Sequence, residues 1–144
     1  MNYKFSTVSA ERLETCDEQL QKVFNLAIKR TPVDFGIVEG HRSPERQNEL
    51  YQQGRSKPGP IVTYVDGIKK KSKHNYSPSQ AVDIVPYYNG SYQWKDRPAF
   101  ALIAGVVLSC AKELGVKLRW GGNWDSDGII LADQSFDDMP HFEL

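Results

Sequence analysis

The feature that most constrains the fold of this chain is a set of three residues that could bind one metal ion. His74 and Asp83 are separated by eight residues, whereas His141 lies close to residue 144. Two imidazoles and one carboxylate form a catalytic type of zinc site, in which a fourth position stays open for water. A fold that uses all three ligands must therefore bring two distant segments of the chain together.

A carboxylate stands close to the last of these residues, since Asp138 precedes His141 by three positions. Zinc lowers the pKa of its bound water toward about 7, and a nearby carboxylate could take the proton. The sequence therefore favours a zinc hydrolase in which Asp138 is the general base. Spacing alone leaves an alternative, in which His74 is an exposed loop residue and Asp83 forms a cap or an ion pair.

Composition sets limits on the function. The chain has 144 residues, which is enough for one domain with a real core, expected to span residues 1–144. Its formal net charge is zero, so no global field favours nucleic acid or a membrane surface. No apolar run approaches a membrane span, and the first residues lack the apolar region of a signal peptide. We expect a cytoplasmic protein that stays there until another factor releases it.

Two minor features carry no function of their own. Cys16 and Cys110 fall on the apolar faces of predicted helices, so we expect buried free thiols; a disulfide has no support from sequence. The basic run at residues 69–73 is expected to be a solvated loop. As an alternative, it could attract an anionic polymer locally.

Hydrophobic spacing predicts three helices, at residues 9–29, 44–53 and 97–114. Their expected N-caps are Ser9, Ser43 and Asp96. Period-two patterns predict strands at residues 33–38, 61–65, 81–85, 118–120 and 141–144. In the last strand His141 and Glu143 should face the same way. Helices and short strands are mixed without a regular alternation, which favours the α+β class.

Five segments occur in an order that resembles a known family. They are Gly40-His41-Arg42-Ser43-Pro44-Glu45-Arg46-Gln47, Ser72-Lys73-His74, Ala81-Val82-Asp83-Ile84-Val85-Pro86, Trp120-Gly121-Gly122-Asn123-Trp124 and Asp138-Met139-Pro140-His141-Phe142. Over residues 33–144 the chain resembles the LAS-type zinc peptidases, which include phage L-alanyl-D-glutamate endopeptidases, D-alanyl-D-alanine carboxypeptidases and the hedgehog domain. The resemblance implies one catalytic domain with a small antiparallel sheet flanked by helices.

The resemblance also implies roles for single residues. It makes His74, Asp83 and His141 the ligands of Zn²⁺, Asp138 the general base, and Arg42 the group that faces the substrate carbonyl or carboxylate. A surface ion pair is the alternative for Arg42. One departure concerns the loop between the first two ligands. The family usually has six residues there with a glycine, whereas this chain has eight, with Ser77-Pro78-Ser79 in the place of the glycine.

Other residues are candidates for the substrate pocket. The resemblance adds Ser43, Gln47 and Trp124 as substrate-binding residues. Gln47 follows Ser43 by one helical turn, so both can point the same way, although packing at the edge of the core is an alternative for Gln47. Trp120 and Trp124 suit the core or a pocket wall better than direct chemistry.

Three further features are not expected to take part in catalysis. His41 is expected to support the structure, because it should point away from Arg42. The stretch Asp125-Ser126-Asp127-Gly128 hints at a calcium loop, but it lacks the third acidic position and the final bidentate glutamate, so an acidic turn is expected. Arg46 is expected to face solvent, which leaves no second arginine beside Arg42 to clamp a C-terminal carboxylate.

The resemblance implies a phage-type endolysin that cuts the L-alanyl-D-glutamate bond of peptidoglycan stem peptides. Such an enzyme is expected to be a monomer that waits in the host cytoplasm until a holin opens the membrane, with no nucleic-acid partner and no membrane insertion. One alternative is a D-alanyl-D-alanine carboxypeptidase, although related carboxypeptidases tend to have a Glu base where this chain has Asp138. Another is a non-catalytic zinc domain that binds a partner, which would need neither Asp138 nor Arg42.

Overall fold

The computed structural model describes residues 2–123 and 138–144, so Trp124 and the acidic turn at 125–128 lie outside the described residues. The elements are α1 (Thr7–Glu14), α2 (Glu18–Arg30), β1 (Phe35–Glu39), α3 (Pro44–Gln52), the 3₁₀ helix η1 (Lys73–Asn75), β2 (Ala81–Tyr88), β3 (Ser91–Tyr92), α4 (Arg97–Glu113), β4 (Arg119–Gly121) and β5 (Asp138–Glu143).

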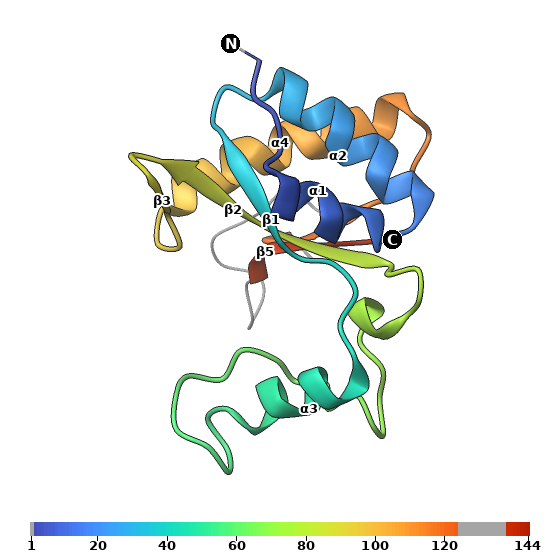
Figure 1. The fold of residues 1–144 in the computed structure, drawn as a ribbon, viewed down its shortest axis with the longest axis vertical. Helices are drawn as coiled ribbons and strands as arrows, with labels where there is room; N and C mark the ends of the chain where they lie inside the picture. Colours follow the sequence, from blue (N-terminus) through green and yellow to red (C-terminus); the bar gives the residue numbers. More distant parts are fainter. Residues whose placement is uncertain (1, 124–137) are drawn as a thin grey trace.

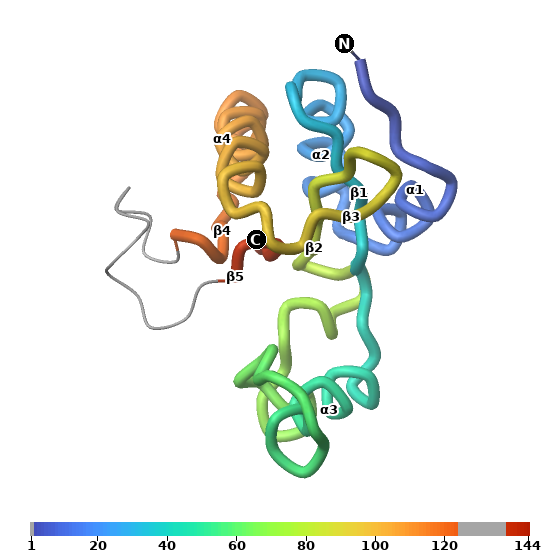
Figure 2. The backbone as a smooth tube through the Cα atoms, turned by 90° about the vertical axis from the view of Figure 1, so that its left-hand side faces the viewer, coloured from blue at the N-terminus to red at the C-terminus, as the bar shows by residue number. Residues whose placement is uncertain are grey.

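All strand pairs of the sheet are antiparallel, and the strand order is β1-β2-β5-β4, with β3 forming a short hairpin with β2. Helix α1 packs on β1, α4 packs on the central strands, and α2 packs against α4. Figures 1 and 2 show α1, α2 and α4 on one side of the sheet, while α3 and its loops form a lobe on the other side. The α+β prediction is therefore confirmed.

The central strands have one apolar side and one polar side. Val82 lies opposite Phe142 across the β2–β5 pair, and both side chains are fully buried in the core that the helices cover. The next pair is Asp83 opposite His141. Because side chains alternate along a strand, the register that buries the apolar pair turns Asp83 and His141 toward the α3 lobe.

Two predicted helices have the expected starts. Ser43 accepts a hydrogen bond from the Arg46 amide at 3.1 Å and caps α3, while Asp96 accepts one from the Ala99 amide at 3.1 Å and caps α4. Both helices carry proline in the first turn, where its missing N–H costs nothing. The prediction that both cysteines are buried free thiols is also confirmed.

The prediction of one helix over residues 9–29 is wrong, because the chain breaks between α1 and α2. At the break, the amide of Asp17 donates to the carbonyl of Ser79 at 2.8 Å, and the amide of Ser79 donates to the carbonyl of Thr15 at 2.9 Å. The longer loop between His74 and Asp83 is thus anchored on the break. Hydrophobic periodicity cannot reveal the break between the two helices, since the apolar spacing continues through both of them.

The expected N-cap at Ser9 is wrong for the same helix. Ser6 caps α1, and the buried Ser9 hydroxyl instead accepts a hydrogen bond from the Ile37 amide at 3.0 Å. The predicted strand at residues 61–65 is also wrong, since these residues form a loop of the α3 lobe without strand pairing. A run of apolar residues there suggested a strand, but within the described residues no neighbouring strand lies beside it.

Candidate functional site

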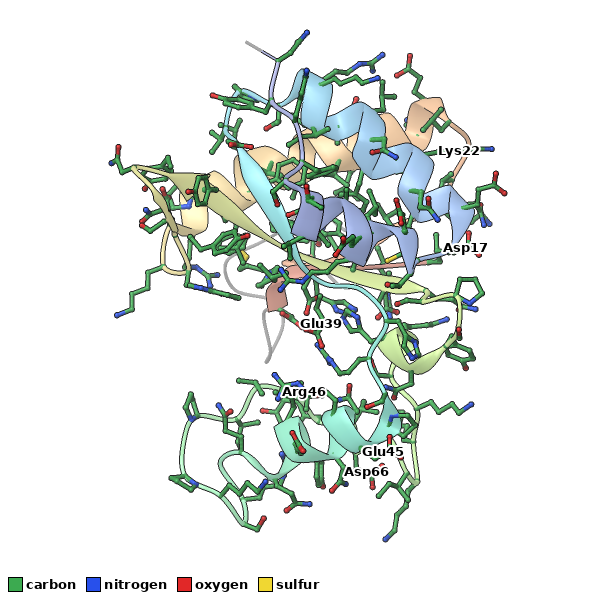
Figure 3. The ribbon with its side chains drawn as sticks, viewed as in Figure 1. Asp17, Lys22, Glu39, Glu45, Arg46 and Asp66 are labelled. Carbon is green, nitrogen blue, oxygen red and sulfur yellow. The ribbon has the colours of Figure 1, made fainter. Side chains whose placement is uncertain are left out.

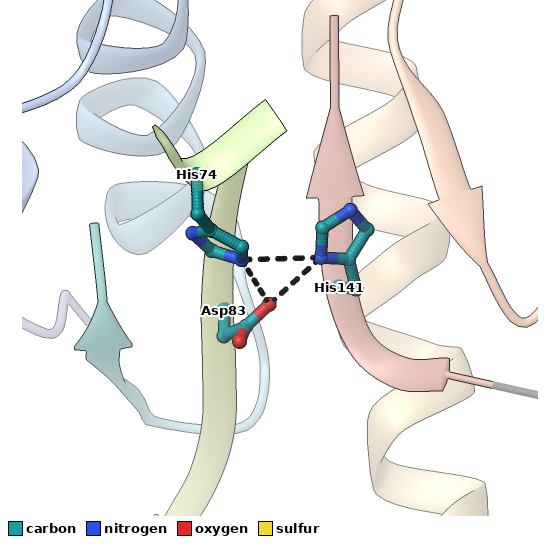
Figure 4. Close-up of side chains that lie close together, drawn as sticks. All are labelled: His74, Asp83 and His141. Atoms are coloured by element: carbon teal, nitrogen blue, oxygen red, sulfur yellow. Dashed lines mark hydrogen bonds and ion pairs between the residues drawn. The ribbon is translucent and has the colours of Figure 1, made fainter. Parts of the chain in front are cut away.

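Three side chains meet on the polar side of the sheet. Nε2 of His74 lies 3.2 Å from Oδ1 of Asp83 and 3.2 Å from Nδ1 of His141, and the third distance, from His141 Nδ1 to Asp83 Oδ1, is 3.0 Å. Figure 4 shows this triangle between β2, β5 and η1. The structure therefore brings together the three residues that the sequence nominated as metal ligands.

The loop around His74 fixes its orientation. Ser72 caps η1 by accepting from the His74 amide at 3.1 Å, and its own amide donates to Oδ1 of Asn75 at 2.9 Å. The buried imidazole donates from Nδ1 to the carbonyl of Gly40 at 2.7 Å. Since a carbonyl can only accept, Nδ1 carries the proton and the lone pair of Nε2 points into the triangle.

His141 is oriented by a carboxylate on its own strand. Its Nε2 lies 2.9 Å from Oε1 of Glu143, whose other oxygen accepts from Arg119 at 2.8 Å. Burial works against the charged form of Glu143, but the contacts with His141 and Arg119 prevail and lower its pKa to about 2. The ionised Glu143 fixes the proton of His141 on Nε2, so that Nδ1 faces the triangle.

Charges are closely paired at the centre of the site. Burial disfavours ionised Asp83, yet the two imidazoles hold the pKa of its carboxyl well below the usual range. Burial likewise disfavours charged His141, but its hydrogen bonds to Asp83 and Glu143 raise its pKa to about 10. In the absence of a cation, the protonated imidazole of His141 therefore balances the charge of the carboxylates beside it.

The donor set fits a zinc ion. Two ligand atoms at bond lengths of about 2.0–2.1 Å on one tetrahedral zinc lie roughly 3.3 Å apart. The three edges of the triangle, 3.2, 3.2 and 3.0 Å, are close to this separation. Both imidazoles also have the outer hydrogen-bond partner that is usual for metal-bound histidine, namely Gly40 and Glu143.

Asp138 reaches the same site through an irregular strand. It precedes His141 by three residues, so a regular strand would place the two side chains on opposite faces. The pairing of β4 with β5 shifts register between Trp120 and Gly121, and Oδ2 of Asp138 lies 4.0 Å from Nδ1 of His141. Burial, and then the charge of Asp83, raise the pKa of Asp138 to about 7, which suits an acid–base group at neutral pH.

Arg42 is held by three partners. Its Nε donates to Glu39 at 2.8 Å, Nη1 donates to Gln47 at 2.8 Å, and Nη2 donates to Oδ2 of Asp83 at 3.3 Å. An arginine side chain has five N–H groups, and these contacts use three of them. The other two can donate to a carbonyl or carboxylate of a ligand. This cluster is partly buried, unlike the surface ion pair considered as the alternative.

The candidate pocket residues differ in their surroundings. The Gln47 side chain is fully buried, and its amide nitrogen donates to Val65 and Thr63, so it joins Arg42 to the α3 lobe. Core-edge packing, the alternative for Gln47, describes this position better than a place in the pocket lining. Ser43 serves as the cap of α3.

A cavity of about 560 Å³ lies between the α3 lobe and the sheet, and the triangle, Arg42 and Asp138 line it. Arg46 also lines it, and 54% of its side chain is exposed, so this arginine faces solvent as predicted but at the mouth of the cavity. Trp94 lines the cavity as well, and no sequence motif pointed to it. Glu143, by contrast, contacts His141 as the predicted alternation of the last strand implies, because it lies two residues after His141.

Comparisons with known proteins identify the family. The family of phage L-alanyl-D-glutamate peptidases matches residues 1–144. The chain belongs to this family. Within the described residues, no helix of this family member is long and apolar enough to cross a membrane.

Two curated relatives and one solved structure agree with this assignment. The L-alanyl-D-glutamate peptidase of Escherichia phage T5 is 34% identical over 128 residues, which are 89% of this chain and 86% of the phage protein. The peptidoglycan L-alanyl-D-glutamate endopeptidase CwlK of Bacillus subtilis is 38% identical over 118 residues, which are 78% of this chain and 61% of CwlK. The crystal structure of the L-Ala D-Glu endopeptidase ChiX of Serratia marcescens has a TM-score of 0.70 and 30% identity, and the match covers 98% of this chain and 90% of ChiX.

Proposed function

We propose that this chain is a zinc peptidase that hydrolyses the L-alanyl-D-glutamate bond of peptidoglycan stem peptides. The observation that carries the proposal is the triangle of His74, Asp83 and His141, with Asp138 and Arg42 beside it in one cavity. Membership of the peptidase family supports the same reaction. The names of the three relatives agree on the bond between L-alanine and D-glutamate.

Zinc held by the triangle would supply a Lewis acid beside the scissile carbonyl. The carboxylate of Asp138 accepts a proton from the attacking water and returns it to the leaving amine of D-glutamate. The two remaining N–H groups of Arg42 stabilise the negative charge that develops on the carbonyl oxygen. Glu39 and Gln47 keep the guanidinium in place, so little reorganisation is needed during the reaction.

We further propose that residues 1–144 act as one catalytic domain and as a monomeric phage-type endolysin. The phage T5 relative supports this role, since it matches along 86% of its own length. In this proposal the enzyme stays in the host cytoplasm until a holin gives it access to the cell wall. Its partner there is the stem peptide, whose backbone must enter a cavity lined by both the sheet and the α3 lobe.

Digestion of purified muropeptides followed by mass spectrometry tests the proposed bond. We expect a new product that begins with D-glutamate, together with glycan that retains L-alanine. A stem peptide with an amidated C-terminus should be cut about as fast as the free acid, because an endopeptidase does not need a terminal carboxylate. Release of free D-alanine from a pentapeptide, abolished by C-terminal amidation, would instead establish a carboxypeptidase.

A further inference from the structure

Arg46 is a cation on the wall of the cavity opposite the sheet. Arg46, Leu50 and Gln53 line the cavity; Arg46 and Leu50 lie four residues apart on one face of α3, and Gln53 is the C-cap of this helix. Figure 3 shows Arg46 on the side of α3 that is turned toward the sheet, with Glu39 across from it at the end of β1. The opposite wall carries the triangle and Asp138.

The stability of α3 does not account for an arginine at this position. Arg46 is the third residue of the helix, where the partial positive charge of the N-terminus disfavours a cation. Its ion pair with Glu49 is long, at 3.6 Å, and both side chains are more than half exposed. Such an exposed ion pair contributes little to the free energy of folding, so stability does not explain why residue 46 is an arginine.

Arg42 and Arg46 differ in what their guanidinium groups can still bind. Arg42 already contacts Glu39, Gln47 and Asp83, and it is largely buried. Arg46 makes its ion pair within the described residues only with the exposed Glu49, which solvent or a ligand can replace. Arg46 is therefore available for an anionic group that enters the cavity.

The proposed substrate brings such a group. A glutamate residue has two carboxyl groups, and a peptide continues through only one of them, so the other stays a carboxylate unless it is amidated. In an L-alanyl-D-glutamate bond this carboxylate lies on the leaving side, within one residue of the scissile amide. On the sheet wall Arg42 is already paired with Glu39 and Asp83. Asp138 adds a carboxylate of the same sign there, whereas a forked guanidinium on the α3 wall matches the substrate carboxylate in charge and shape.

We propose that Arg46 is a specificity-determining residue that binds the free carboxylate of D-glutamate, so that the enzyme selects stem peptides in which this group is not amidated. The inference rests on the proposed function, because it presupposes that D-glutamate lies on the leaving side of the cut. It deepens that function by naming the chemical form of the substrate.

The test uses two stem peptides that differ only at this carboxyl group, one as the acid and one as the amide. We expect the wild type to cut the acid roughly 10- to 100-fold better in kcat/KM, the range of a charge-assisted hydrogen bond. Arg46→Gln should reduce the rate on the acid to that on the amide. Arg46→Glu should reverse the preference, and it suits the first turn of a helix, so folding is not at risk. Thermal unfolding of both variants should match the wild type.

Lys57→Gln is the matched control, because it removes one positive charge from the α3 lobe at an exposed residue outside the cavity lining. It should keep the preference for the acid. Three outcomes would overturn the role of Arg46 and leave the proposed function standing. The wild type could cut both peptides at equal rates, or Arg46→Gln could lose activity equally on both peptides. The third outcome is that Lys57→Gln loses the preference for the acid. If the wild type cuts neither peptide before D-glutamate, the proposed function fails and the inference fails with it.

Discussion

At the scale of single residues, the site depends on acid–base groups whose partners set their protonation. His74 and His141 each have one nitrogen committed to an outer partner, so the other nitrogen of each points into the triangle. Asp83 is held ionised, whereas Asp138, three residues from His141, is shifted to a pKa of about 7. Two partly buried carboxylates in one cavity thus differ in proton affinity, which is a frequent property of hydrolytic sites.

The first prediction concerns catalysis by Asp138. Asp138→Asn keeps the shape of the side chain but cannot accept a proton, so we expect kcat to fall by roughly 10²- to 10⁴-fold. Zinc content, measured by elemental analysis, should stay at the wild-type level, because Asp138 is not a ligand in the triangle. A variant that keeps more than about a tenth of the activity would rule out Asp138 as the base.

The second prediction concerns the stability of the zinc-free protein. The pKa of Asp138 is raised from 3.8 to about 7, so the folded state binds this proton more tightly than the unfolded state does. The resulting stabilisation is fully present below pH 4 and is lost as the pH rises through about 7. Over this window it amounts to roughly 4 kcal/mol, at about 1.4 kcal/mol per pKa unit.

Asp138→Asn has no titrating carboxyl at this position, so comparison with the wild type isolates the contribution of Asp138 to the pH dependence of stability. In chelator, the free energy of unfolding of the wild type should decrease relative to that of Asp138→Asn between pH 5 and pH 8. Urea denaturation of both proteins at the two pH values measures the change. A difference between the two proteins that does not vary with pH would contradict the raised pKa.

At the scale of elements, close contact between β4 and β5 determines where Asp138 points. A Cβ atom on Gly121 would lie 2.0 Å from the carbonyl oxygen of Asp138, and a backbone atom cannot move aside as a flexible side chain would. Gly121 therefore permits the irregular pairing that turns Asp138 toward His141. Within the sequence Trp120-Gly121-Gly122, a glycine is thus needed at position 121 for steric reasons.

The third prediction follows from this contact. Gly121→Ala should push β5 away from β4 and displace Asp138, and a shift of about 1 Å in a catalytic group can cost on the order of 100-fold in rate. Gly105→Ala is the control, because Gly105 is an exposed residue within α4, and among the described residues no atom lies within 4 Å of its added Cβ. It should leave kcat/KM unchanged and stabilise the protein by about 0.5–1 kcal/mol. Similar activities of the two variants would show that the β4–β5 contact does not position Asp138.

At the scale of the whole molecule, the site lies where two parts of the fold meet. The helices cover one side of the sheet and bury Val82 and Phe142, while the other side faces the α3 lobe across the cavity. The triangle draws ligands from η1, β2 and β5, so a bound ion would link segments that are distant in sequence. Metal binding should therefore stabilise the entire fold and not only the site.

The fourth prediction is a test of that linkage. Chelation should lower the midpoint of thermal unfolding of the wild type and abolish activity, since zinc at 100 times its Kd stabilises the folded state by about 2.7 kcal/mol. His74→Ala should show no response to chelator. His41→Ala should respond as the wild type does, because His41 is exposed and contacts the carbonyl of Tyr76 instead of the triangle. A similar response of the two variants would contradict the assignment of His74.

The sequence by itself determined what local patterns encode. The caps Ser43 and Asp96, the apolar alternation of β2 and the ligand candidates could be read directly, because each depends on residues close together in the chain. The resemblance added the family, which the comparisons confirm. The roles of Arg42, Gln47 and Asp138 remain proposals that the geometry supports.

Only the tertiary structure decided features that depend on pairing between distant segments. The break between α1 and α2 exists because Ser79 bonds to both sides of it, and apolar spacing contains no record of that partner. The direction of Asp138 depends on the shifted β4–β5 register, which overrides the alternation that a strand predicts. Arg46 faces the cavity because the α3 lobe lies opposite the sheet. Local periodicity fixes which face of an element is apolar, whereas long-range contacts fix what the other face meets.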